Sequence, residues 1–131
     1  MTMVQSPLPY IVAFFIFAVG LYAISVKKNL IKVIIGVVIL ENAANLFLVL
    51  VGYRMPASGE AIAPIATPQM GGPRQAAQVL LERAVDPLPQ ALVLASIVIG
   101  LAVMALMVVL ALRLHEKYGT FDLTHISKLK G

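Results

Sequence analysis

The chain has 131 residues, of which 60% are hydrophobic and 12% are charged, and its formal net charge is +4. Soluble domains carry about 25% charged residues and disordered chains are far less hydrophobic, so this composition argues against both classes. The lack of cysteine excludes disulfides, thiolate metal sites and a cysteine nucleophile. Lys and Arg stand at the ends of apolar runs, which is typical of membrane orientation and not of nucleic-acid binding.

Three apolar runs are long enough to be candidate membrane helices. They extend over 10–26, 30–52 and 91–112, and a bilayer crossing needs about 20 residues. No Lys or Arg precedes the first run, so we expect a retained helix and not a cleaved signal peptide. The sequence predicts an all-α membrane protein with a single membrane domain, 1–131, made of helices at about 8–27, 30–53 and 87–118, a loop at 54–86 and a tail at 119–131.

The distribution of positive charge predicts how the chain is oriented. Cytoplasmic loops carry an excess of Lys and Arg, so the richer side is expected to be inside. With the N-terminus outside and the C-terminus cytoplasmic, seven basic residues lie inside and three outside. The inside set is Lys27, Lys28, Lys32, Arg113, Lys117, Lys128 and Lys130, and the outside set is Arg54, Arg74 and Arg83.

The segments between and after the spans carry clear start and stop signals. The outer loop is rich in Pro and Gly, and within it 75–85 favours a short helix that serves as a connector. Asp86 is expected to cap the third helix, Pro87 suits its first position, and Gly119 ends it. The polar tail that follows, with Phe121, Leu123, Ile126 and Leu129, is expected to dock onto a partner.

Glu41 is the residue that requires an explanation. It lies at the middle of the second run, roughly 16 Å from either end at about 1.5 Å per residue, so its side chain cannot reach the interface. A carboxylate at mid-bilayer costs about 2.5–3.5 kcal/mol on insertion scales. Protonation, a cationic partner or a water-filled passage must offset this cost. Membrane-centre acids are functional by default, which favours a place for Glu41 in a proton or cation route.

Three other polar residues share the second run with Glu41. Lys32 is nine positions away, about 180° around the helix and about 13 Å along it, so it cannot pair with Glu41. It is either an interfacial anchor or part of an ion route. Asn45 shares the face of Glu41, and Asn42 is on the adjacent stripe. The two Asn either orient water and the carboxyl group or hydrogen-bond across helices and hold an assembly together.

Two stretches of the chain resemble a known family. The stretch Asn29-Leu30-Ile31-Lys32 with Gly36 and Asn42-Ala43-Ala44-Asn45-Leu46, and the stretch Asp86-Pro87-Leu88-Pro89-Gln90-Ala91-Leu92-Val93-Leu94, are similar to the MrpC-type subunits of multisubunit cation/proton antiporters of the Mrp class. The basic pair before Asn29 and the end of the tail resemble the NuoK-like subunit of complex I. The tail looks more like the archaeal respiratory versions.

The resemblance implies a three-helix subunit of a larger assembly. Related modules occur in Mrp antiporters, in archaeal membrane-bound hydrogenases and in related sulfur-reducing complexes. It implies other membrane subunits and the lipid bilayer as partners, H⁺ and Na⁺ as the ions moved, and a multi-pass location in a prokaryotic plasma membrane. No cofactor and no nucleic acid are expected.

One departure from the family pattern concerns its acids. The complex I relatives carry a glutamate where this chain has Val38, and a second one near Val103, and neither role is carried over. Glu41 lies about one helical turn beyond Val38, so it is placed to serve a nearby point on a similar route.

These residues bear on four classes of function. The leading hypothesis is a subunit whose Glu41, Asn42, Asn45 and Lys32 contribute to an ion path. The alternative is a purely structural assembly subunit with Glu41 in an ion pair between subunits. A small exporter would need four spans and a rotor subunit two. An enzyme would need a nucleophile and base set that the spans lack, so the chain is expected not to be catalytic alone.

Overall fold

A computed structural model describes residues 6–53, 56 and 59–128 of the chain. Within them, three helices are long and apolar enough to cross a membrane, which confirms the three predicted spans. The predictions that fall on Arg54, Leu129 and Lys130 lie outside the described residues. The elements are α1 (Leu8–Val26), α2 (Leu30–Val51), the 3₁₀ turn η2 (Pro68–Met70), α3 (Pro73–Arg83), α4 (Pro87–Tyr118) and α5 (Leu123–Ile126).

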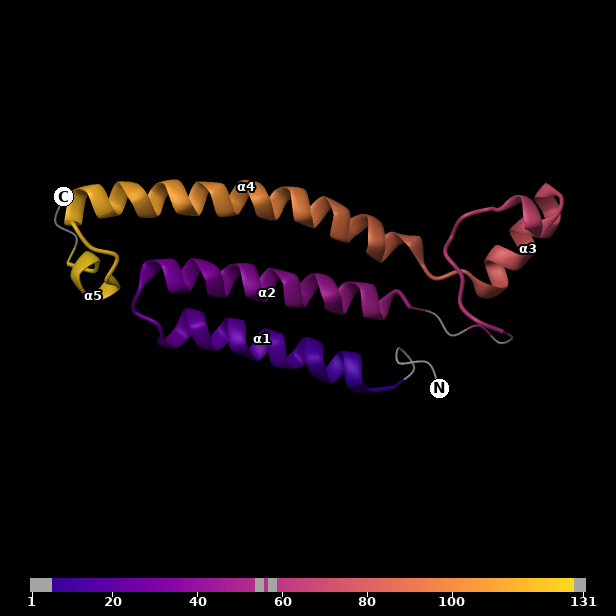
Figure 1. The fold of residues 1–131 in the computed structure, drawn as a ribbon, viewed down its shortest axis with the longest axis horizontal. Coiled ribbons are helices and arrows are strands. Elements are labelled where there is room, and N and C mark those ends of the chain that lie inside the picture. Colours follow the sequence, from indigo (N-terminus) through magenta and orange to yellow (C-terminus); the bar gives the residue numbers. More distant parts are fainter. Residues whose placement is uncertain (1–5, 54–55, 57–58, 129–131) are drawn as a thin grey trace.

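The three long helices form a single layer with α2 in the middle. α2 packs on α1 along one side and on α4 along the other (Figure 1). α3 lies beyond one end of the layer, and α5 lies at the other end (Figure 1). α4 has 32 residues and is therefore about 48 Å long, more than the roughly 30 Å of the bilayer core. α4 must extend out of the hydrocarbon region.

Small residues let α1 and α2 approach each other closely. A Cβ at Gly20 would lie 3.0 Å from the Leu40 nitrogen, and a Cβ at Gly36 would lie 2.8 Å from the Ala23 Cβ. Ala13 and Ala43, which are both 2% exposed, extend the same contact. Near the other end of the pair, the Tyr10 hydroxyl donates a hydrogen bond of 3.1 Å to the Leu50 carbonyl. Close packing of small residues is how membrane helices associate without a hydrophobic driving force.

One stripe of α4 faces α2, and the rest of α4 is exposed. Its members recur every three or four residues, as one face of an α-helix requires. Near the start of α4, a Cβ at Gly52 would lie 2.7 Å from the Pro89 Cγ, so the end of α2 meets the first turn of α4. The stripe consists of Pro89, Val93, Ser96, Gly100, Met104, Met107, Ala111, Leu114 and Tyr118.

The ends of α4 carry the caps that the sequence predicts, and α2 has an N-terminal cap that was not predicted. The Asp86 carboxylate accepts a hydrogen bond of 3.0 Å from the Leu88 N–H, and Pro87 is the first residue of α4. Gly119 ends α4 with φ 70°, a left-handed conformation that favours glycine. α2 begins after Asn29, whose side-chain oxygen accepts from the N–H groups of Ile31 and Lys32.

The tail docks on its own chain, and its docking onto a partner stays a prediction. The Leu30 N–H donates to the Phe121 carbonyl at 2.8 Å, and the Leu123 N–H donates to the Lys28 carbonyl at 2.7 Å. The Phe121 ring stacks on the His115 ring with centroids 4.3 Å apart. The α1–α2 turn and the tail therefore lie at one end of the layer. Which side of the membrane that end faces stays a prediction.

The glycine contact between α1 and α2 makes a testable prediction. Gly36→Val should destabilise the packing by about 1–3 kcal/mol, because the new side chain meets Ala23 and the α1 backbone. The measurement is thermal unfolding of the purified chain in detergent. Gly72→Ala is the control, since a Cβ at Gly72 has no atom within 4 Å. Equal stability of the two variants would show that α1 and α2 do not pack through this contact.

Candidate functional site

The Glu41 side chain lies between α2 and α4, against Gly100. A Cβ placed on Gly100 would overlap the Glu41 carboxyl group, so the absence of a side chain there makes room for the acid. A cavity of about 200 Å³ adjoins the two residues. It is lined by Val38, Glu41, Asn42 and Asn45 of α2 and by Ile97, Gly100, Leu101 and Met104 of α4. We call this the Glu41 cavity.

The two Asn predicted to lie near Glu41 share its cavity. The Asn42 side-chain amide donates a hydrogen bond of 2.8 Å to the Val38 carbonyl one turn earlier, while the side chain remains exposed. Asn45 is half-buried, as Glu41 is. A carboxyl group with two carboxamides beside it can hydrogen-bond water, exchange a proton or attract a cation. The space is large enough to hold several water molecules.

The described part of the chain supplies no counter-charge to Glu41. Its one ion pair joins Arg113 to Glu116 on an exposed turn of α4, at 3.5 Å. No basic side chain lines the Glu41 cavity. An acid in a membrane-spanning helix requires a proton, a cation or water, and the described residues provide no cation for Glu41.

Lys32 is not brought to the Glu41 cavity. It lines a different pocket, at the start of α2, together with Lys27, Lys28, Asn29 and Asp122. Of the four predicted ion-path residues, three therefore meet in one cavity and the fourth lies near the end of the layer.

The two positions at which the family resemblance implies acids lie in different surroundings. Val38 lines the Glu41 cavity together with Glu41. Val103 is 45% exposed and is not among the cavity residues.

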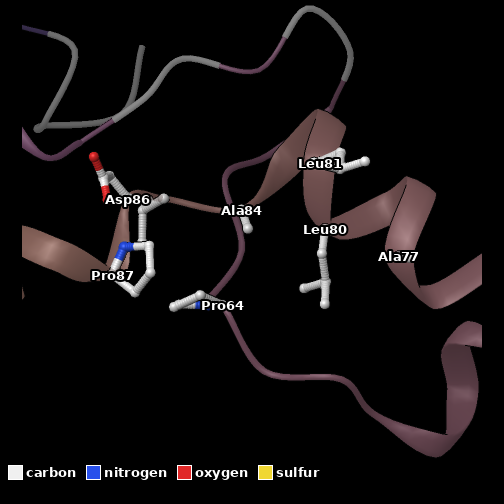
Figure 2. Close-up of a pocket in the computed structure, with 8 residues that line it drawn as sticks. Pro64, Ala77, Leu80, Leu81, Ala84, Asp86 and Pro87 are labelled. Atoms are coloured by element: carbon white, nitrogen blue, oxygen red, sulfur yellow. The ribbon is translucent and has the colours of Figure 1, made fainter. Parts of the chain in front are cut away.

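The loop between α2 and α4 forms a second hollow, of about 590 Å³, between α3 and the start of α4. Pro64, Ala77, Leu80, Leu81, Ala84 and Pro87 surround it, and Asp86 lies at its rim (Figure 2). A parallel bridge between Ile62 and Ala84 closes the loop, with hydrogen bonds of 3.0 Å on both sides of it. The one acid here, Asp86, is used as the cap of α4. This hollow is built as a connector, and nothing in it supplies acid–base chemistry.

Sequence reasoning found Glu41 but missed the partner position that accommodates it. Gly100 is one of several small residues of α4 that permit helix contact. The signal that distinguishes it is position: a glycine in mid-membrane costs helix stability, and here it is level with the acid of the neighbouring helix.

Comparisons with known proteins confirm the resemblance seen in the sequence. Residues 8–131 match the family of NADH-ubiquinone/plastoquinone oxidoreductase chain 4L. The C1 subunit of the Na⁺/H⁺ antiporter of Staphylococcus epidermidis is 36% identical over 98 residues, 72% of this chain and 69% of that protein. The C1 subunit of the Staphylococcus aureus antiporter is 32% identical over 118 residues, 87% of this chain and 84% of that protein.

A solved structure is similar over almost the whole chain. It is a chain of the membrane-bound sulfane sulfur reductase, an archaeal respiratory membrane complex. The identity is 38%, the TM-score is 0.68, and the match covers 94% of this chain and 97% of the other.

The contact between Glu41 and Gly100 makes a second prediction. Gly100→Ala should destabilise the α2–α4 packing by about 1–3 kcal/mol, because the added methyl group displaces the carboxyl group. Glu41→Ala in the same chain should remove most of that penalty. The measurement is a double-mutant cycle of thermal stability in detergent. Strict additivity of the two changes would show that the residues do not touch.

Proposed function

The chain belongs to the family of NADH-ubiquinone/plastoquinone oxidoreductase chain 4L, and on that premise we propose that it is a small accessory subunit of a multisubunit Na⁺/H⁺ antiporter module in a respiratory membrane complex. The staphylococcal relatives are named as antiporter subunits, and the similar solved chain comes from a respiratory complex. These names support a multi-pass place in a prokaryotic plasma membrane, with other membrane subunits as partners. On its own the chain is not catalytic, and redox chemistry belongs to its partners.

Within that module, we propose that Glu41 takes part in the proton or cation path. The observation that carries this is the placement of its carboxyl group in a cavity between two membrane helices, without a cation from the described part of its own chain. A fixed structural acid needs a permanent partner, whereas an acid in a water-sized space can bind and release a proton or attract a passing cation. Asn42 and Asn45 orient water or the carboxyl group.

Lys32 has a weaker claim to this path. Nine residues separate it from Glu41, about 13 Å along the helix, and it lies among other lysines at the start of α2. Its place favours an interfacial role over a step in ion transfer.

A static role for Glu41 is the second candidate. The observation that favours it is the same lack of a counter-charge, since a basic residue of a neighbouring subunit would neutralise the acid. In that case the acid holds the complex together and does not titrate.

Glu41→Gln separates the two functions. If Glu41 carries protons or attracts cations, the variant should assemble normally while ion transport falls by about tenfold or more, because an amide cannot exchange a proton in its place. Transport is measured in membrane vesicles that contain the assembled complex. Assembly is measured on native gels.

Glu82→Gln is the matched control, because Glu82 is exposed on α3 and the chemical change is the same. Loss of the complex in Glu41→Gln would favour the static ion pair. Normal transport with normal assembly would eliminate both roles.

A further inference from the structure

Three lysines surround a pocket at the end of the layer where the tail docks. The pocket measures about 270 Å³ and is lined by Lys27, Lys28, Asn29, Lys32 and Asp122. The three ammonium groups and the one carboxylate leave an excess of two positive charges. The pocket lies between the last residue of α1, Val26, and the first turn of α2, so it is level with one boundary of the bilayer.

The backbone around this pocket is fixed. Asn29 and Asp122 form an antiparallel bridge, and the hydrogen bonds from Leu30 to Phe121 and from Leu123 to Lys28 hold the two chain segments together. The Asn29 side chain already accepts from two N–H groups at the start of α2. These two N–H groups are therefore not available to a ligand, and an anion in the pocket would bind to the lysine ammonium groups.

An apolar track leads to the same pocket along the outer face of α1. Phe15, Val19, Tyr22 and Val26 follow one another at helical spacing, and each is more than half exposed. This line is on the side of α1 opposite to the buried Ala13 and Gly20, at the edge of the layer. The Lys27 Nζ lies 5.3 Å from the centre of the Tyr22 ring, at the point where the track reaches the basic pocket.

We propose that this pocket binds the phosphate group of an anionic phospholipid, whose acyl chains lie along the α1 track. The pocket and the track together are complementary to such a lipid. Three lysines at the end of an exposed apolar strip match a molecule with a negative headgroup and apolar chains. Basic pockets between membrane helices bind anionic headgroups in this manner. This site is separate from the Glu41 cavity and does not depend on the proposed ion path.

Asp122 has a specific place in this site. Hydrogen bonds from the Thr124 hydroxyl and N–H to its carboxylate hold the pKa of Asp122 below its usual value, so it is ionised at neutral pH. Its negative charge opposes an anionic headgroup. Asp122→Asn retains a side-chain oxygen that can cap α5 and removes this charge, so the affinity for the lipid should rise by about fivefold.

The experiment uses the full chain in detergent, titrated with phosphatidylglycerol or with phosphatidylcholine of the same acyl chains. Bound lipid is counted by native mass spectrometry. We expect phosphatidylglycerol to bind preferentially and Lys27→Gln/Lys28→Gln/Lys32→Gln to weaken it by about 100-fold, since each cation contributes roughly a factor of five. Circular dichroism checks the fold, and the corresponding triple Arg variant should retain binding.

The control is Arg113→Gln/Lys117→Gln/Lys128→Gln, which removes the same charge from exposed positions near the same end of the layer. Retention of binding in this control supports a local site. Equal binding of the two lipids, unchanged binding in the pocket variant, or an equal loss in the control would overturn the proposal. So would occupation of the pocket by an acidic segment of a neighbouring subunit in the assembled complex.

Discussion

The organisation of the spans depends on the need to accommodate one carboxyl group in the middle of a bilayer. Glu41 cannot reach water at either end of its helix, and lipid offers it no hydrogen-bond donor. α4 meets this need by presenting Gly100 at the level of the acid, so the carboxyl group occupies a space in which any other residue would place a side chain. The cavity beside the pair adds room for water or an ion. What remains unsatisfied within the described part of this chain is charge.

The single-layer arrangement explains why such a chain works as a subunit. α1 and α4 lie on opposite sides of α2 within the layer (Figure 1). The long helices of this chain therefore leave α2 uncovered above and below the plane of the layer. The α2 residues that line the Glu41 cavity lie on a different face from Ala43 and Phe47, which line an apolar groove with α1. The Asn42 side chain is polar and exposed, so a neighbouring protein, which can hydrogen-bond to it, suits this position better than lipid. Neighbouring subunits in a complex can therefore contact the Glu41 cavity and supply the positive charge that the described residues lack.

Much of the fold was predictable from sequence, because its rules are local. The lengths of the apolar runs predict the three membrane spans. Asp86, Pro87 and Gly119 set the ends of α4 through side-chain and backbone chemistry. The position of Glu41 at mid-membrane also follows from counting. Its contact with Gly100 does not, since helix spacing alone cannot tell which of two neighbours a face meets. The docking of Phe121 onto His115, and of the tail beside Lys28, places together residues that no periodic pattern connects.

We expect the Glu41 carboxyl group to change its protonation or its bound cation in the working complex. Infrared difference spectroscopy of the complex in membranes, recorded as pH is changed, tests this directly. A carboxyl C=O band should appear and disappear with pH, shift with isotope-labelled glutamate and be lost when Glu41→Gln is introduced. A carboxylate signal from Glu41 that stays constant across the pH range, in the presence and absence of Na⁺, would contradict a role in the ion path and indicate a permanent ion pair.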